Sequence, residues 1–543
     1  MINRVQRIAD KRRRASRRAF CPSLLITIIA FLPIATRAQV TTSQYDNART
    51  GADVHETILT PRNVNANQFG KLFALHVDGD VYAQPLYLPH IAIPGKGTHN
   101  VLFVATEYDS VYAFDADAPS QEPLWHARFY DPGKAIEPLT PEEVACPFIV
   151  PTIGITSTPV IDAAAGTIYV LARTSEHGAY FQKLHALDVT TGAERTGSPV
   201  TIQASAPHKT LGLLSNPVDF DPVRENPRAA LLLSHGTVYL SWASSCDVGP
   251  YHGWMIAYDA GTLQQVGVFN TSPDSDEGGI WAGDAGPAAD SSGNVFVATG
   301  NGTFDAASKG GRDYGDSVLK LALTPPGLTV ADYFTPFDQE KLKAADNDLG
   351  SGGPVLLPDQ PGPHPHVLVV GGKGAMIYVI DRDHMGKFHA GDDSHAVQTI
   401  PTKDMIFGAA AYWNRHIYYL VSHDVLRDFS LQDGKLSLAA QGTVSFADPG
   451  ATPTISANGT KDGIVWVIET KGFQAPDRRS ILHAFEAADV AHEIYNNAQN
   501  NDRDWAGRTL RFTIPTIANG RVYVGTKNEV DVYGLLPAAK KQK

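Results

Sequence analysis

The chain has 543 residues, a formal net charge of −12 and 19% charged residues. This length is ample for a large buried core, and 48 glycines with 36 prolines indicate many turns rather than long helices. The acidic balance argues against nucleic acid and against anionic lipid as partners, because both are bound through Lys and Arg.

The N-terminal segment, residues 1–38, differs from the rest of the chain. Eight Lys and Arg residues precede residue 20, and a short apolar run follows at residues 24–34. A basic region, a short apolar run and the small-residue site at 36–38 are typical of an export signal, and Arg17-Arg18 resembles the twin-arginine type. A membrane anchor is the alternative, but the run has about half the ~20 residues that a span needs. We therefore expect a periplasmic or extracellular protein with no membrane span after signal removal. Without this segment, which carries a net charge of +8, the chain is near −20.

Three cysteines are present, and Cys21 falls within the export signal. Cys146 and Cys246 remain, a pair compatible with one disulfide in an oxidising compartment. The sequence leaves open whether the two meet in space. No adjacent cysteine pair, zinc-type cluster or Cys-x-x-Cys-His motif occurs, which excludes a fused haem module.

From residue 80 onward a pattern recurs eight times with a period of about 60 residues. Each copy has an apolar run often opened by Pro, a turn with Gly or Asn, a β-branched and aromatic run, a third run often ending in Asp, and a weaker fourth run. The second and third runs of the copies lie at residues 101–106 and 111–115, 167–171 and 184–188, 237–240 and 254–259, 294–299 and 317–321, 366–370 and 377–381, 416–421 and 425–429, 463–468 and 481–485, and 521–525 and 530–533. Four short strands per copy predict one propeller blade, because a ring of blades buries each sheet against its neighbours.

The last copy lacks a convincing fourth run, and residues 69–77, before the first copy, form an unassigned apolar run. We expect this run to complete the last blade and lock the ring. The sequence thus predicts an all-β chain with a single propeller of about eight four-stranded blades over residues 39–536. Seven blades would result if a weak copy, such as the sixth, were an insertion. Residues 537–543 are expected to form a disordered tail.

Several motifs are more specific than a generic propeller. Residues 187–192 (LDVTTG) resemble the docking motif of blades in the pyrroloquinoline quinone (PQQ) family, and residues 45–51 (YDNARTG) resemble the N-terminal segment of that superfamily. Other phrases resemble those of secreted bacterial propellers described as PQQ-binding-like, namely VYAQPL at 81–86, GITSTPVID at 154–162, GGIW at 278–281, TGNG at 299–302 and LGSGG at 349–353. The resemblance covers about residues 44–535 and implies the PQQ-type propeller fold, whose members differ in function.

The quinoprotein alcohol dehydrogenases of this superfamily use PQQ and calcium, with an adjacent cysteine pair over the cofactor. This chain has no such pair, and the Glu, Asn and Asp ligands of that calcium do not align with it. PQQ and calcium are therefore cofactors that the resemblance suggests but the motifs do not establish. No nucleotide cofactor is expected, because the Gly-Asn-Gly at 300–302 precedes no helix.

Ligands of propellers usually bind at one mouth of the central channel, between the loops that lead into the innermost strands and those that join the second and third strands. From these loops we select Lys373, Trp281, Asn301 and Glu107 as candidate cofactor-binding residues, and Asp346 and Asp348 as candidate metal ligands. A tricarboxylate quinone needs a cation and an aromatic plane, and oxygen donors suit calcium. Each candidate also has a structural interpretation: a hairpin turn for Lys373, packing between blades for Trp281, and turn chemistry for the Asp pair.

Three functions fit these observations. A non-catalytic binding or scaffold propeller with a protein or glycan partner accounts for the fold without a catalytic set, and the sequence favours it. A periplasmic PQQ- and calcium-dependent alcohol or sugar dehydrogenase is the second, and another propeller enzyme that acts on polysaccharide is the third. The first two differ in one feature: a dehydrogenase needs a cation, carboxylates and an aromatic ring in one pocket at the channel mouth.

Overall fold

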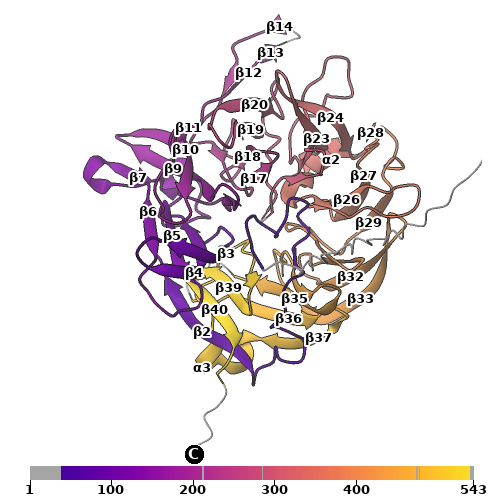
Figure 1. Ribbon diagram of the computed structural model, residues 1–543. Coiled ribbons are helices and arrows are strands. Elements are labelled where there is room, and N and C mark those ends of the chain that lie inside the picture. The colour runs from indigo at the N-terminus through magenta and orange to yellow at the C-terminus, as the bar shows by residue number, and fades with distance from the viewer. Residues whose placement is uncertain (1–37, 211–212, 284, 473–474, 476, 538–543) are drawn as a thin grey trace, which may run out of the picture. The chain divides into compact units, whose positions relative to one another are not determined.

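The computed structural model describes residues 38–210, 213–283, 285–472, 475 and 477–537. The expected export signal, apart from Ala38, and residues 538–543 of the expected tail lie outside this range. The described residues belong to one compact unit, Arg37–Lys543, built from eight β-sheets that form the blades of a propeller (Figure 1). Within the described residues, no helix is both long and apolar enough to cross a membrane.

Each repeat of the sequence forms one antiparallel blade. The first blade consists of β3 (Leu86–Ile93), β4 (Gly97–Thr106), β5 (Ser110–Asp115) and β6 (Trp125–Arg128), and the second of β8 (Val160–Asp162), β9 (Thr167–Glu176), β10 (Ala179–Asp188) and β11 (Val200–Thr201), with β7 (Ile136–Pro138) also paired with β9. The third blade consists of β17 (Leu232–Ser234), β18 (Thr237–Ser244), β19 (Trp254–Asp259) and β20 (Gln265–Asn270), with β16 (Glu225–Asn226) also paired with β18. The fourth blade consists of β21 (Ala288–Ala289), β22 (Val295–Ala298), β23 (Val318–Thr324) and β24 (Gly327–Thr335), with β28 (Lys387–Phe388) added in parallel to β24.

The last four blades consist of β25 (Val355–Leu356), β26 (Val367–Gly372), β27 (Met376–Asp381) and β29 (Gln398–Pro401); β30 (Ala411–Trp413), β31 (His416–Tyr419), β32 (Val425–Gln432) and β33 (Lys435–Ser445); β34 (Thr454–Asn458), β35 (Lys461–Glu469), β36 (Ile481–Glu486) and β37 (Asp489–Asn496), with β1 (Ala52–Asp53) parallel to β34; and β38 (Thr516–Ala518), β39 (Arg521–Thr526), β40 (Glu529–Leu535) and β2 (Phe69–His76). The predicted eight-bladed propeller is therefore confirmed, and the sixth copy is a full blade.

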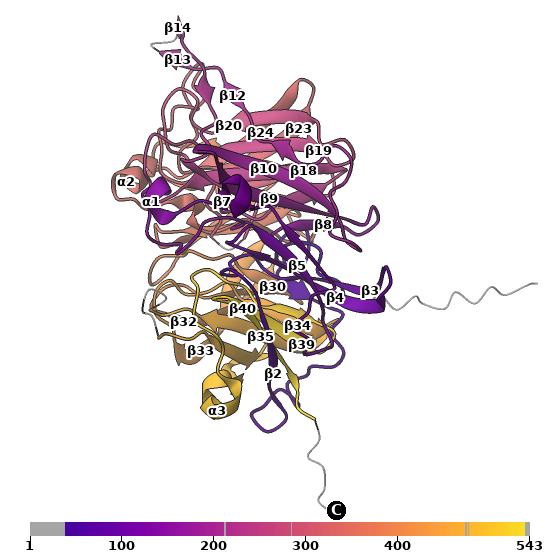
Figure 2. The same ribbon diagram turned by 90° about the vertical axis from the view of Figure 1, so that its left-hand side faces the viewer.

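Loops between the strands carry the remaining short elements. These are η1 (Pro132–Lys134), α1 (Pro141–Val144), α2 (Gln339–Ala344), η2 (Leu349–Ser351), η3 (Asn497–Asn500) and α3 (Asn501–Asp504), and the hairpin pairs β12 (Ser205–Ala206) with β15 (Val218–Asp219) and β13 (Lys209–Thr210) with β14 (Leu213–Leu214). The hairpin pairs form an arm that projects from the third blade (Figure 1), and α1 and α2 lie on the same face of the ring (Figure 2).

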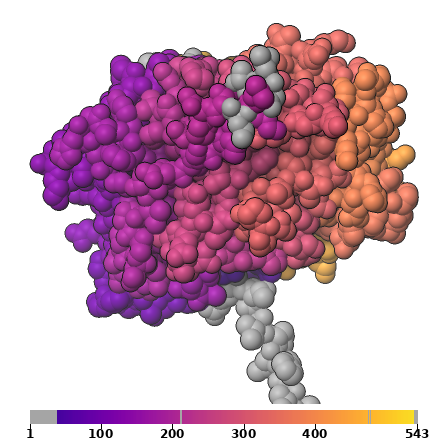
Figure 3. Space-filling model, turned by 90° about the horizontal axis from the view of Figure 1, so that it is seen from above, coloured from indigo at the N-terminus to yellow at the C-terminus, as the bar shows by residue number. Residues whose placement is uncertain are grey.

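Blades pack face to face around the ring. Their first strands lie nearest the centre, where β17 contacts both β8 and β21. Buried aliphatic and aromatic side chains from adjacent blades share one cluster, as Leu171 of β9 and Leu240 of β18 do. Figure 3 shows the same closeness from outside, where the surface passes from the early to the later blades without a gap. Such packing explains how short strands with two apolar faces become buried.

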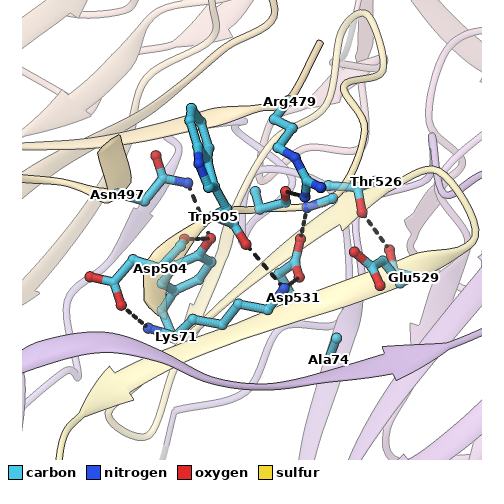
Figure 4. A network of polar contacts seen from close by, with 12 residues as sticks. Lys71, Ala74, Arg479, Asn497, Asp504, Trp505, Thr526, Glu529 and Asp531 are labelled. Atoms are coloured by element: carbon cyan, nitrogen blue, oxygen red, sulfur yellow. Dashed lines mark hydrogen bonds and ion pairs between the residues drawn. The ribbon is translucent and has the colours of Figure 1, made fainter. Parts of the chain in front are cut away.

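The ring is closed by a strand from the N-terminal side, as the sequence predicts. Strand β2 pairs antiparallel with β40, from Phe69 opposite Leu535 to His76 opposite Glu529. Lys71 of β2 forms an ion pair with the fully buried Asp531 of β40 and donates to the carbonyl oxygen of Trp505 at 3.1 Å (Figure 4). A buried charge pair therefore reinforces the closing strand.

The N-terminal segment that precedes β2 crosses the innermost strands of several blades. Backbone amides of six of them donate to this segment, one example being Tyr412, which donates to the Thr50 carbonyl at 2.7 Å. Arg49 is fully buried and donates to the carbonyl oxygens of Pro287 at 2.9 Å and Leu231 at 3.1 Å. The segment that resembles the N-terminal part of PQQ-type propellers thus has a structural role, because it joins the innermost strands of several blades by hydrogen bonds.

Candidate functional site

A cavity of about 300 Å³ lies at one mouth of the channel. Its walls come from the loops that lead into the innermost strands, which we call the inner loops, and from two loops that join second and third strands. The inner loops, with Asn226 of β16, contribute Tyr82, Cys146, Phe148, Ile149, Ile153, Arg228, Trp281, Gly283, Asp346, Asp348, Ser351, Phe407, Arg511 and Phe512. The other two loops, with Ser244 at the end of β18, contribute Ser245, Cys246, Asp247 and Lys373. The mouth expected from the sequence is therefore where the cavity lies.

One side of the cavity is a network of a lysine and two aspartates. Lys373 stands in the hairpin between β26 and β27, and its ammonium forms an ion pair with Asp348 and lies 3.3 Å from Asp346 Oδ1. The Asn301 backbone N–H donates to Asp348 Oδ1 at 2.7 Å, and its side-chain amide donates to Asp346 Oδ1 at 2.5 Å. Four of the six predicted site residues thus come together, three of them on the cavity wall.

Burial controls the charge state of this network. The side chain of Asp348 is only 3% exposed, and burial raises its pKa even though Lys373 acts in the opposite direction. Burial also lowers the pKa of Lys373, but the two aspartates outweigh it, so the net shift is upward. We therefore expect a charged ammonium held against Asp348 at neutral pH.

Close packing of neighbouring loop segments explains the glycines in the motifs around this network. A Cβ on Gly300 would lie 2.2 Å from Asp348 Oδ1 and 2.8 Å from Trp281 Nε1. A Cβ on Gly372 would lie 2.6 Å from the Asp348 carbonyl oxygen. Both positions must therefore lack a side chain for Asp348 to reach Lys373.

Trp281 forms the aromatic wall next to this network. Its ring packs edge-on to Tyr251, with centroids 6.3 Å apart, and the Tyr251 hydroxyl donates to Asp247 Oδ1 at 2.9 Å. Burial raises the pKa of Asp247, which lines the cavity. The indole Nε1 of Trp281 is buried and has no hydrogen-bond partner among the described residues. This nitrogen lies against the backbone, 2.8 Å from the position of a Cβ built on Gly300, so the indole contributes its ring to the cavity wall.

The same cavity is lined by two arginines that lie over aromatic rings. The guanidinium of Arg228 lies 5.4 Å from the Tyr82 ring centroid and 5.1 Å from that of Phe512. The guanidinium of Arg511 lies 4.4 Å from the Phe512 centroid and 5.3 Å from that of Phe407. Guanidinium groups held by ring faces bind carboxylates in a fixed orientation.

The sequence analysis did not select Arg228 or Arg511 as site residues. Arg228 and Arg511–Phe512 immediately precede the first runs of the third and eighth repeats, so the rule that selected Trp281 also covers them. Neither belongs to a known motif, however, and an Arg before an apolar run is an ordinary surface pattern. Their position in the inner loops was the available signal.

Glu107 takes a different position from the other candidates. It does not line the cavity but is buried behind it, where it accepts the Gly154 N–H at 2.8 Å. Burial raises the pKa of Glu107 to about 7, and the nearby Arg228 acts against that shift. The geometry gives Glu107 a supporting role for the inner loop of the second blade.

A disulfide forms part of the cavity wall. Cys146 and Cys246 are bonded with their Cα atoms 5.5 Å apart, which joins the inner loop of the second blade to the β18–β19 loop of the third. Phe148, two residues after Cys146, lies at the rim of the cavity with 45% of its surface exposed. Its carbonyl oxygen accepts from the Tyr82 hydroxyl at 3.5 Å. We call residues 145–152 the rim loop.

Calcium does not fit these donors. Among the described residues no group of three or more His, Cys, Asp or Glu side chains is placed to hold a metal ion. Asp346 and Asp348 lie together, but the ammonium of Lys373 already pairs with Asp348 and lies 3.3 Å from Asp346 Oδ1. Calcium takes about six to eight oxygen ligands. A planar carboxylated molecule does fit, because two arginines, a lysine and an indole face a cavity of suitable size.

No family model and no curated protein matches the sequence of this chain. Solved structures do match its fold. The quinohemoprotein alcohol dehydrogenase ADHIIG from Pseudomonas putida HK5 is 15% identical, with a TM-score of 0.60 over 93% of this chain and 81% of that one. A europium-containing methanol dehydrogenase is 13% identical, with a TM-score of 0.56 over 92% of this chain and 98% of that one.

This chain shares its propeller fold with these two dehydrogenases. The expected resemblance to PQQ-type propellers is therefore confirmed at the level of the fold. BamB from Moraxella catarrhalis, 12% identical, aligns with a TM-score of 0.47 over 86% of this chain and 99% of that one.

Proposed function

We propose that this chain is an exported ligand-binding propeller whose cavity holds a planar, carboxylated molecule of the PQQ type. One observation carries the proposal: three side-chain cations, three carboxylates and Trp281 meet in a single cavity at the channel mouth. This convergence is the feature that distinguishes a ligand site from a scaffold, which uses its rim or outer face. Solved structures of the same fold whose names include an alcohol dehydrogenase and a methanol dehydrogenase support the choice of ligand.

On this proposal, different residues of the cavity make different contacts with the ligand. Arg228 and Arg511 hold carboxylates of the ligand, and Trp281 offers a ring for stacking. When bound, a quinone supplies two-electron oxidation of an alcohol or sugar. The cavity carboxylates from which a proton acceptor for a substrate hydroxyl would come are Asp247, Asp346 and Asp348, and Asp348 is already engaged by Lys373 and the Asn301 N–H.

The test is calorimetric titration of PQQ into the exported protein, run beside dye-linked oxidation of an alcohol and sugar panel. We expect one PQQ per chain with a dissociation constant of about micromolar or tighter. An Arg228→Ala variant is expected to bind more weakly, whereas Lys343→Met, outside the cavity lining in α2, is expected to bind normally. Absence of binding at high micromolar PQQ would refute the proposal.

A non-catalytic role remains the second candidate, and one observation favours it. The carboxylates of the cavity are not arranged for the calcium that the resembling dehydrogenases use. If this candidate holds, the calorimeter records binding while no alcohol or sugar is oxidised, so the two measurements together separate a cofactor enzyme from a binding module.

A further inference from the structure

We propose that Lys373 takes the place of a divalent metal, so that the cavity binds its carboxylated ligand without calcium. This inference rests on the proposed function and specifies how the site supplies positive charge. It concerns the network of Lys373, Asp346, Asp348 and Asn301 on the cavity wall.

The position of Lys373 is fixed from two directions. Its backbone N–H donates to the Asp348 carbonyl oxygen at 2.9 Å, and its ammonium pairs with the Asp348 carboxylate. The lysine side chain is 17% exposed and that of Asp348 3%, so the pair is largely shielded from water. Two anchors on one short hairpin hold the ammonium at the carboxylates in the free protein.

The oxygen atoms that would coordinate a metal are already engaged. Asp348 uses one carboxylate oxygen for Lys373 and the other for the Asn301 N–H. Asp346 Oδ1 accepts from the Asn301 side-chain amide and faces Lys373 at 3.3 Å. A metal ion would have to displace the ammonium and both amide donors. The oxygens left over are far fewer than the about six that calcium requires.

Two further cations contribute positive charge to the cavity. Arg228 and Arg511 line the same cavity as Lys373, and a guanidinium keeps its charge even when buried. Three side-chain cations therefore line the cavity beside three aspartates, one of which, Asp348, is paired with Lys373. On this proposal the cations supply the positive charge toward the ligand's carboxylates that a bound metal would otherwise provide.

The first experiment compares PQQ titrations of the wild-type protein in excess EDTA and in excess calcium chloride. We expect the two dissociation constants to agree within about threefold, which is less than about 1 kcal/mol. Binding that appears only with calcium, or is about tenfold tighter with it, would overturn the inference. If PQQ binds in neither condition, the proposed function itself fails, and that result is distinct from calcium-dependent binding.

The second experiment replaces the lysine. In EDTA, Lys373→Met is expected to weaken PQQ binding about tenfold or more, and Lys373→Arg is expected to restore most of it. Lys343→Met is the matched control, since Lys343 also pairs with a carboxylate, Glu277, but does not line the cavity. Thermal denaturation of each variant checks its folding. Wild-type affinity of a folded Lys373→Met protein in EDTA would overturn the inference, and if that variant does not fold, the wild-type comparison decides alone.

Discussion

Replacing Lys71 by Met should weaken the closure of the ring. Lys71 lies on β2, the strand that completes the last blade, and pairs with Asp531, whose side chain is fully buried (Figure 4). Met keeps the length of the side chain and removes the charge. Among the described residues, the hydrogen-bond donor left to Asp531 would then be the Gly507 N–H, which donates to its Oδ2 at 2.6 Å. Breaking a buried pair by removing one partner costs about 3–5 kcal/mol.

The cost should depend on pH. Burial raises the pKa of Asp531 from 3.8 to about 6, although Lys71 lowers it. Because the folded-state pKa is the higher one, the favourable contribution of this group is complete below about pH 4 and is lost as pH rises through 6, by about 3 kcal/mol. Without Lys71 the pKa of Asp531 rises further. In acid the Asp531 carboxyl is neutral with or without Lys71, so little is lost there by removing the lysine. The penalty of Lys71→Met should therefore be small at about pH 5 and full at about pH 8.

Urea denaturation followed by fluorescence at these two pH values measures the penalty. Lys134→Met is the control, because Lys134 pairs with Asp131 at 2.9 Å on the surface, with 74% and 44% of their side chains exposed. It should leave the midpoint unchanged. The double variant Lys71→Met/Asp531→Asn should recover much of the loss. An equal penalty at both pH values, or none at about pH 8, would refute the reasoning.

Three further predictions concern the cavity. Arg511→Ala should weaken PQQ binding about tenfold or more in calorimetry, because a charged hydrogen bond is lost; unchanged affinity would remove Arg511 from the site. Cys146→Ser opens a link between residues 100 positions apart, so it should lower the free energy of unfolding by about 2–5 kcal/mol and speed proteolysis in the rim loop; a protease pattern identical to wild type would contradict this. Trp281→Phe should reduce the quenching of tryptophan fluorescence by PQQ, while Trp413→Phe, outside the cavity, should not.

The fold could be predicted almost completely from the sequence because each blade is a local repeat. Strand runs with β-branched residues and Gly or Asn turns recur at a readable period, and the missing fourth strand of the last copy pointed to residues 69–77. The disulfide could only be suggested, since Cys146 and Cys246 lie in loops of different blades and their approach depends on the packing of those blades.

The site was predicted only in part, for a physical reason. Lys373, Trp281, Asp346 and Asp348 were found because the repeat assigns them to loops at one mouth, and the structure brings them to one wall. Glu107 belongs to the same loop class but turns behind the cavity. Arg228 and Arg511 come from repeats far apart in the chain, so only the closed ring shows that they line the same cavity as Lys373.

The most direct test of the account is a crystal structure of the exported protein grown with PQQ in the presence of EDTA. The account predicts the quinone in the channel-mouth cavity, with its ring on Trp281, its carboxylates at Arg228 and Arg511, and the Lys373–Asp348 pair intact beside it. PQQ bound elsewhere, or an empty cavity in protein that calorimetry shows to be saturated, would contradict it.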